Sequence, residues 1–276
     1  MTVREALREV ERRLEAANVP TPRVDSELLL AHVLRTTRSG IHAHLDQPLD
    51  GTWETLVARR EAREPLAYIL GEWGFRRLTL NVDPRVLVPR PETEVVVERC
   101  LELIRPLASP RVLDVGTGSG AVALSIAHEH PGAYVVAVDD SRDALAVAAT
   151  NVEATGLGRR VEVLQHDLRH GVALGRFDLV VSNPPYVRAD EIDELEPEVR
   201  DWEPRAALVG EGVDQQIAAA ARTPLRAGGW VVLETAAGNV RLLARRLAAL
   251  GYADVRITPD LTDVERVVEG RWPSTL

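Results

Sequence analysis

The stretch Arg111-Val112-Leu113-Asp114-Val115-Gly116-Thr117-Gly118-Ser119-Gly120, followed by the apolar run 121–127, decides the fold. Its first half is short and apolar, as in a buried strand, and the small and apolar residues after the glycines predict a helix. The three glycines permit backbone geometry that side chains forbid, and they let a ligand approach the main chain at a helix N-terminus. A tight strand-to-helix turn without a ligand is the alternative interpretation.

The spacing of these glycines differs from that of a dinucleotide-binding fingerprint. Such a fingerprint has the form Gly-x-Gly-x-x-Gly, whereas this sequence has Gly-x-Gly-x-Gly with Asp114 two places before the first glycine. A carboxylate there suits a ligand with a cationic end, which a pyrophosphate lacks. We therefore take as candidate ligand-binding residues Asp114, Gly116, Thr117, Gly118, Ser119 and Gly120.

Two further strands are predicted at 133–139 and 160–165, and both lead into polar residues. In doubly wound folds a carboxylate at the end of the second strand hydrogen-bonds ribose hydroxyls, which makes Asp139 a candidate. Capping of the helix predicted over 142–154, by Asp140 or Ser141 as well as by Asp139, competes with that role, and both roles are compatible. The third strand leads to His166-Asp167-Leu168, a suitable edge for a purine ring.

The fourth predicted strand, 177–182, runs directly into Asn183-Pro184-Pro185-Tyr186. Prolines lack an N–H and fix φ, so they end the strand and hold the residues before them extended. The Asn183 side-chain oxygen and the Pro184 carbonyl then form two fixed acceptors for the two hydrogens of a planar NH2 group. Tyr186 offers an aromatic face to a flat, conjugated group. A turn that merely ends the strand is the alternative.

The order of predicted elements indicates the fold class and the domains. All four candidate segments follow strand ends, where open α/β sheets bind ligands. Alternating helices and strands from residue 92 onward predict an α/β fold with a doubly wound, mostly parallel sheet. Later segments are a helix at 240–250 and strands at 229–233, 253–257 and 266–269, the last two forming an antiparallel edge. Helices predicted at 6–14, 26–34 and 52–60 indicate a helical domain over 1–73, with a β-hairpin linker over 74–91 and a third domain over 92–276.

The chain resembles the class I S-adenosylmethionine-dependent methyltransferases, which are Rossmann-like, and within them the protein-(glutamine-N5) methyltransferases of peptide chain release factors. Besides the two motifs, the resemblance rests on 22–32, 64–71 with Phe75, and 86–94, which includes Pro89-Arg90-Pro91-Glu92-Thr93-Glu94. Three places depart from the family pattern. Asp140 replaces an apolar residue, Leu168 stands where some members carry an aromatic, and 234–239 differs from Glu-x-Gly-x-x-Gln. We assign no site residue to that last run.

The resemblance implies an activity and site residues. S-adenosyl-L-methionine would be the methyl donor, held by 116–120, Asp139, Leu168 and Asn183, while 183–186 would hold a glutamine, with Asn183, Pro184 and Tyr186 catalytic. The acceptor would be the side-chain N5 of the glutamine in the Gly-Gly-Gln motif of a release factor, and the helical domain would recognise that protein. Three alternatives stay open: glutamine-N5 methylation of a ribosomal protein, N-methylation of an exocyclic base amine in nucleic acid, and a non-catalytic binding module.

Composition limits the function classes and the cellular locations that we expect. The 276 residues are 45% hydrophobic with a net charge of −9, which argues against a broad nucleic-acid surface. We expect a cytoplasmic monomer with no membrane segment, no signal peptide and no metal, since the histidine pairs lack matching ligands. Cys100 is the single cysteine and is expected to be buried in a helix. The acidic run 190–196 is predicted to be a solvated helical face or a mobile flap; the alternative is contact with an arginine-rich partner surface.

Overall fold

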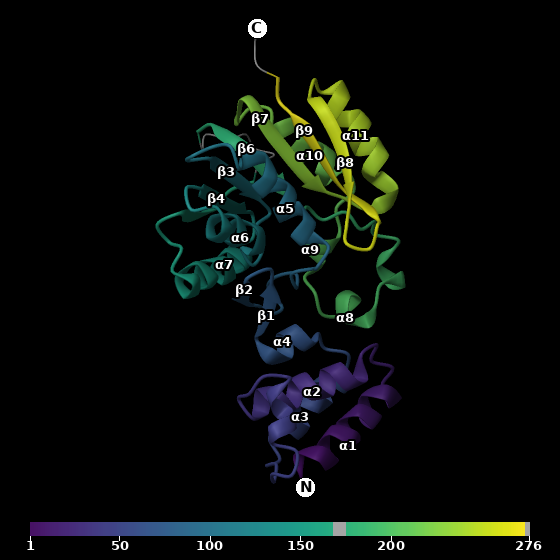
Figure 1. Ribbon diagram of the computed structural model, residues 1–276. Helices are drawn as coiled ribbons and strands as arrows, with labels where there is room; N and C mark the ends of the chain where they lie inside the picture. Colours follow the sequence, from purple (N-terminus) through teal and green to yellow (C-terminus); the bar gives the residue numbers. More distant parts are fainter. Residues whose placement is uncertain (168–174, 274–276) are drawn as a thin grey trace. The chain divides into compact units, whose positions relative to one another are not determined.

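A computed structural model describes residues 1–167 and 175–273, which divide into two compact units (Figure 1). One unit consists of Met1–Glu72 together with Leu195–Trp202, and the other of Trp73–Glu194 and Glu203–Leu276. The eight residues 195–202 therefore belong by their contacts to the first unit, although they lie in the sequence between two parts of the second.

The first unit is helical. It contains α1 (Val3–Ala16), α2 (Pro22–Val33), the 3-10 helix η1 (Gly40–Ala43), α3 (Trp53–Glu61), α4 (Leu66–Leu70) and α8 (Pro197–Arg200). A capping box starts α1: the Thr2 hydroxyl accepts from the Glu5 N–H, and the Glu5 carboxylate accepts from the Thr2 N–H. The three helices predicted here are confirmed, with α2 starting earlier than expected because Pro22 suits a first turn. The short helices η1, α4 and α8 were not predicted.

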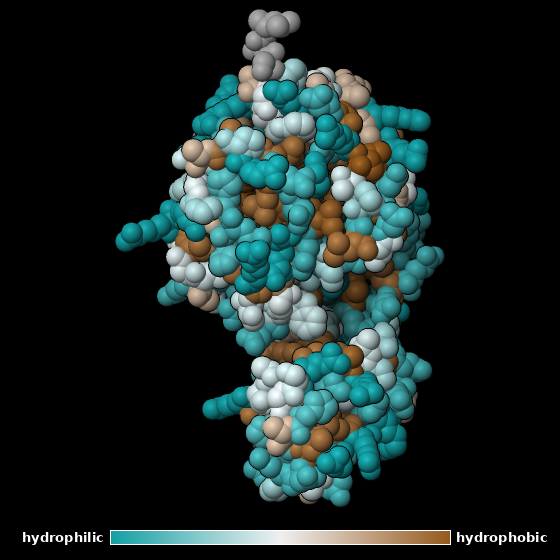
Figure 2. Space-filling view, viewed as in Figure 1, coloured by the Kyte–Doolittle hydropathy of each residue, from teal (hydrophilic) through white to brown (hydrophobic). Residues whose placement is uncertain are grey.

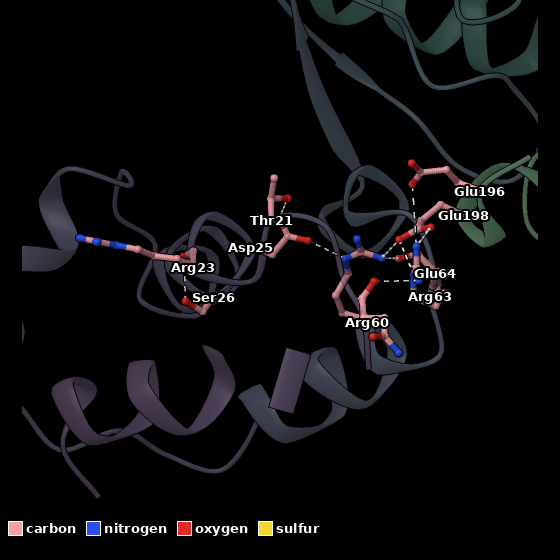
Figure 3. A network of polar contacts seen from close by, with 10 residues as sticks. Thr21, Arg23, Asp25, Ser26, Arg60, Arg63, Glu64, Glu196 and Glu198 are labelled. Carbon is pink, nitrogen blue, oxygen red and sulfur yellow. Dashed lines mark hydrogen bonds and ion pairs between the residues drawn. The ribbon is translucent and has the colours of Figure 1, made fainter. Parts of the chain in front are cut away.

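A buried ion-pair network centred on Arg60 holds the first unit together (Figure 3). The Arg60 Nε donates to Asp25 at 2.7 Å, and its Nη1 donates to the Glu64 carbonyl at 3.0 Å and lies 2.9 Å from Glu198. Arg63 binds Glu198 through two further hydrogen bonds and lies 3.8 Å from Glu196. Glu196 is the last residue of the predicted acidic run, and Glu198 follows it closely. Their arginine partners, Arg60 and Arg63, belong to this same chain.

We predict that Arg60→Met destabilises the protein by about 3–5 kcal/mol, because it leaves the buried Asp25 carboxylate without its cation. The Arg60 and Asp25 side chains are only 5% and 4% exposed. Arg12→Met is the matched control, since its pair with Glu9 is solvent-exposed, and it should leave stability almost unchanged. Urea denaturation followed by circular dichroism measures both, and equal stabilities of the two variants would contradict the prediction.

The second unit is built on a seven-stranded sheet. In spatial order its strands are β5 (Val161–Gln165), β4 (Tyr134–Asp139), β3 (Arg111–Val115), β6 (Phe177–Ser182), β7 (Leu225–Glu234), β9 (Glu265–Arg271) and β8 (Ala253–Pro259). The first five are parallel, whereas β9 runs antiparallel to β7 and β8 antiparallel to β9. The predicted doubly wound sheet and its antiparallel edge are confirmed. The predicted hairpin is also present but shorter, with β1 (Glu72–Phe75) paired to β2 (Leu78–Asn81).

Helices cover both faces of this sheet. One apolar cluster packs α5 (Thr93–Ile104), α6 (Ala121–Glu129) and α7 (Arg142–Thr155) against one face. The other packs α10 (Val213–Ala220) and α11 (Val240–Ala249) against the opposite face. Successive residues of β3 take opposite sides: Val112 belongs to the first cluster and Leu113 to the second. Strands buried on both faces explain the nearly continuous apolar runs in the sequence.

Several features of the sequence take their expected place, and others were not predicted. Cys100 is buried in α5, as predicted. The helices α9 (Arg205–Leu208) and α10 and the 3-10 helices η3 (Ile192–Glu194) and η4 (Ala237–Asn239) were not predicted. Within 1–167 and 175–273, no helix has the length and apolar character needed to cross a membrane. Hydrophilic residues predominate on the face shown in Figure 2, with apolar residues in small groups.

Candidate functional site

Two neighbouring parallel strands deliver the two motifs to the same edge of the sheet. The ladder pairs Val115 at the end of β3 with Ser182 at the end of β6. The Ser182 hydroxyl also donates to the Val115 carbonyl at 2.7 Å. Because β4 and β5 lie on one side of β3 and β6 on the other, the strand order changes direction here. Such switch points are where open α/β sheets bind ligands, outside the carboxyl ends of the strands.

Backbone hydrogen bonds hold the glycine loop after β3 in a tight turn. The N–H groups of Gly116 and Thr117 both donate to the Val138 carbonyl, at 2.8 and 3.0 Å. Gly116, Gly118 and Gly120 have φ values of 71°, 55° and 84°, in the left-handed region that side chains disfavour. The loop therefore depends on these glycines for its geometry, and it leads directly into the first turn of α6.

Asp139, at the end of β4, ties the glycine loop to the second strand. Its Oδ2 accepts from the Gly118 N–H at 2.9 Å, and its Oδ1 accepts from the Ser141 N–H at 3.0 Å. Burial raises the pKa of this carboxyl, and the two backbone donors partly offset that effect. Ser141 caps α7, because its hydroxyl accepts from the Ala144 N–H. The predicted capping of this helix is therefore performed by the Ser141 side chain.

Asp114 is a buried carboxyl beneath the glycine loop. It is 1% exposed, and its Oδ2 accepts from the Thr117 hydroxyl at 2.7 Å and from the Ala123 N–H at 3.2 Å. Burial raises the pKa of Asp114 to about 7, despite these two hydrogen bonds. The nearby charge of Asp139 raises it further. A cation bound close by would favour the ionised form of this group.

Hydrogen bonds connect both ends of the Asn-Pro-Pro-Tyr segment to one carboxylate. The Asn183 Nδ2 donates to the Thr93 hydroxyl at 3.0 Å, and that hydroxyl donates to Glu234 Oε2 at 2.8 Å. The Tyr186 hydroxyl donates to Glu234 Oε1 at 3.2 Å. Burial raises the pKa values of Glu234 and Tyr186 alike.

A cavity of about 310 Å³ collects most of the predicted site residues. Those that line it are Asp114, Gly116, Thr117, Gly118, Ser119, Asp139, Asp167, Asn183, Pro184 and Pro185. Gly120 and Tyr186 are not among the lining residues, although both belong to the motifs. Leu168, a predicted contact for the donor, lies outside the described residues.

Other lining residues were missed as site residues. They include Phe75 at the end of β1, Arg90 before α5, Thr93 at the start of α5, Ala207 in α9 and Val213 at the start of α10. The Pro-Arg-Pro-Glu-Thr-Glu run carried the signal that would have indicated Arg90 and Thr93. Glu234 does not line the cavity but reaches it through Thr93, and it lies in the run to which we assigned no role. In the part of the chain that the structure describes, no group of three or more His, Cys, Asp or Glu could hold a metal ion.

Comparison with known proteins identifies the family. Residues 5–71 match the PrmC N-terminal domain, and residues 93–196 match the methyltransferase small domain. The chain is 39% identical to the release factor glutamine methyltransferase of Geobacter sulfurreducens, over 98% of this chain and 96% of that one. It is 41% identical to that of Cereibacter sphaeroides, over 99% and 100% of the two chains. The chain belongs to the release factor glutamine methyltransferase family.

Solved structures agree with this family at the level of the fold. The catalytic domain of hMettl16, solved in complex with MAT2A 3'UTR hairpin 6, is 16% identical with a TM-score of 0.59, covering 80% of this chain and 82% of that one. A SAM-dependent O-methyltransferase from Thermotoga maritima is 13% identical with a TM-score of 0.50, over 69% and 74% of the two chains. At such identities the likeness concerns the class I methyltransferase fold alone. This fold and the family imply S-adenosylmethionine as the methyl donor.

Gly210 tests how tightly the Asn-Pro-Pro-Tyr segment is packed. A Cβ added at Gly210 would lie 2.5 Å from the Pro185 carbonyl oxygen and 2.8 Å from its Cγ. The Gly210 N–H also donates to the Val187 carbonyl at 3.1 Å, just after the motif. We predict that Gly210→Ala lowers the free energy of unfolding by about 1–3 kcal/mol, because the backbone must shift to relieve the overlap.

Gly238→Ala is the matched control, since an added Cβ there meets no atom within 4 Å. Guanidinium denaturation of both variants measures the difference. Equal free energies of unfolding for the Gly210 and Gly238 variants would show that the Asn-Pro-Pro-Tyr segment adjusts without loss of stability, and would contradict the prediction.

Proposed function

We propose that this protein transfers a methyl group from S-adenosylmethionine to the side-chain amide nitrogen, N5, of a glutamine in a peptide chain release factor. The observation that carries the proposal is the placement of Asn183 and Pro184 in the same cavity as the glycine loop, in a chain of this family. Following the resemblance noted in the sequence, we propose the glutamine of the Gly-Gly-Gln motif as the acceptor.

The chemistry of the cavity fits the proposed donor. Asp139 is a partly buried carboxylate at the end of the second strand, suited to ribose hydroxyls, and residues of the glycine loop line the cavity. Apolar side chains such as Val86, Leu87 and Val122 line part of the wall and would suit an adenine ring. Asp114 supplies the negative charge that a cationic ligand favours. When bound, the donor supplies a methyl group activated by a sulfonium.

Asn183 and Pro184 then act on the acceptor. An amide nitrogen is a poor nucleophile because its lone pair is delocalised into the carbonyl. The Asn183 Oδ1 and the Pro184 carbonyl accept the two hydrogens of the substrate NH2 group and orient its nitrogen. These hydrogen bonds strengthen as positive charge develops on the nitrogen, which stabilises the transition state selectively. Positioning of this kind is worth up to about 7–11 kcal/mol in ideal cases.

The reaction needs neither a metal nor a dedicated base in this proposal. The sulfonium already activates the methyl group, so no Lewis acid is required. The methylated nitrogen carries an excess proton that it loses readily to solvent. We also propose that the substrate is protein and not nucleic acid, in keeping with the net charge of −9.

We predict that Asn183→Ala reduces turnover by about 100-fold or more, because one of the two acceptors for the substrate amide is lost. The affinity for the donor should change little. The assay incubates enzyme and labelled donor with release factor, ribosomal proteins and RNA in parallel. Mass spectrometry then identifies the residue or base that carries the transferred methyl group. Titration calorimetry measures donor binding.

Asn239→Ala is the control for this substitution, since Asn239 is exposed and lies outside the cavity. Full turnover by the Asn183 variant would refute the assigned role. Methylation of ribosomal protein or RNA in place of release factor would refute the proposed substrate.

We predict that the affinity for the donor rises as the pH rises through about 7. The pKa of Asp114 is raised to about 7 in the free protein, and a bound cation favours the carboxylate, so binding releases a proton. Asp114→Asn should flatten this dependence. Calorimetry in buffers of different ionisation enthalpy counts the protons released. The same pH slope in the wild type and the variant would contradict the prediction.

A further inference from the structure

We propose that Thr93 and Glu234 are positioning residues that hold the Asn183 amide in one orientation, with its oxygen free for the substrate. Neither residue was assigned a role from the sequence. The inference rests on the proposed function, since the oriented oxygen is the one that accepts from the substrate amide.

The direction of each hydrogen bond follows from counting hydrogens. The Thr93 hydroxyl has a single hydrogen, and it lies 2.8 Å from Glu234 Oε2. An ionised carboxylate only accepts, so Thr93 donates its hydrogen to Glu234. The Thr93 oxygen can then only accept from its other neighbour, Asn183, at 3.0 Å. A donor must therefore face Thr93, and the donor of the Asn183 side chain is its NH2 group.

The opposite orientation of the amide is excluded by the same count. Rotation of the Asn183 side chain by half a turn would place its oxygen against a hydroxyl oxygen that has no hydrogen left. Two acceptors would then face each other among buried groups. Neither would have a hydrogen-bond donor in place of the water it has lost, and this costs free energy. Thr93 and Glu234 are 5% and 1% exposed, so water does not readily replace the missing donor.

The fold brings the carboxylate to both ends of the tetrapeptide. The ladder between β6 and β7 pairs Ser182 with Leu233. Asn183 and Glu234 are the residues that directly follow this pair on the two neighbouring strands. One oxygen of Glu234 acts on Asn183 through Thr93, and the other accepts from the Tyr186 hydroxyl at 3.2 Å. A single buried group thereby fixes the first and last residues of the motif.

Protonation of Glu234 would undo this arrangement. Burial raises its pKa, while the donors Thr93 and Tyr186 and the charge of Arg266 lower it and the charge of Glu92 raises it. As the pH falls through this raised pKa, the neutral acid becomes a donor to Thr93. The Thr93 hydrogen is then free to reach Asn183, and the amide can turn its oxygen away from the substrate. Glu234→Gln resembles the neutral acid, because its amide NH2 also donates.

The experiment compares Thr93→Val, Thr93→Ser and Glu234→Gln with the wild type in the methylation assay with release factor. Thr93→Val keeps the shape and removes the hydroxyl, so kcat should fall on the order of 10- to 100-fold while donor affinity is unchanged. Thr93→Ser keeps the hydroxyl and should restore most of the turnover. At saturating donor, the kcat of the wild type should fall at low pH, whereas Glu234→Gln should show a low kcat without this acid limb.

Thr235→Val is the matched control, because it breaks a similar buried pair that does not reach the motif. The Thr235 hydroxyl donates to Asp214 at 2.7 Å, and both residues are buried. This variant should lose stability as Thr93→Val does, yet keep its kcat. If Thr93→Val and Thr235→Val lose kcat to the same extent, the loss comes from general destabilisation, and the inference is overturned.

A second readout does not depend on turnover. Hydrogen exchange of the Asn183 side-chain NH2, followed by NMR and assigned with Asn183→Asp, should be slow in the wild type and in Thr93→Ser and fast in Thr93→Val. Equal exchange in all three proteins would overturn the inference. An inactive wild type with this protection pattern would instead contradict the proposed function and leave the hydrogen-bond assignment supported.

Discussion

The pairing of β3 with β6 in one parallel sheet is the constraint on which the site depends. It places the glycine loop and the Asn-Pro-Pro-Tyr segment, which are about 65 residues apart in the sequence, at adjoining strand ends. The side chain of Ser182 reinforces the junction through the Val115 carbonyl. Without this register, the two motifs would be separate loops and no cavity could combine a donor site with a receptor for a planar amide.

Two carboxylates, Asp139 and Glu234, hold the polar groups of this cavity in place. Asp139 holds the glycine loop through Gly118, and Glu234 holds the tetrapeptide through Thr93 and Tyr186. Both carboxylates are largely buried, where hydrogen bonds to ionised groups are strong and unpaired groups are costly. The Asn-Pro-Pro-Tyr segment is thus restrained in two ways: its prolines restrict the backbone, and the buried Glu234 carboxylate restricts its side chains.

The helical unit includes a part of the chain that follows the Asn-Pro-Pro-Tyr segment. Glu198 follows Tyr186 in the sequence, yet its carboxylate binds Arg60 and Arg63 among the N-terminal helices. A buried arginine is stable only when its charge is compensated, so this unit requires the later segment to complete its interior. The chain therefore passes from the second unit into the helical unit at residue 195 and returns to the second unit at residue 203.

The sequence by itself determined the fold class, the order of the strands along the chain and the residues that line the cavity from the two motifs. Those features are local: apolar runs, glycine spacing and paired prolines act within a few residues. Tertiary structure alone decided the roles of Thr93, Glu234 and Arg60, because each acts on a residue far away in the sequence. The late run 234–239 departs from the family pattern, and only the hydrogen bonds through Thr93 show that its first residue is connected to Asn183. Long-range hydrogen bonds between buried side chains leave no periodic signal in a sequence, since they depend on strand register and helix placement.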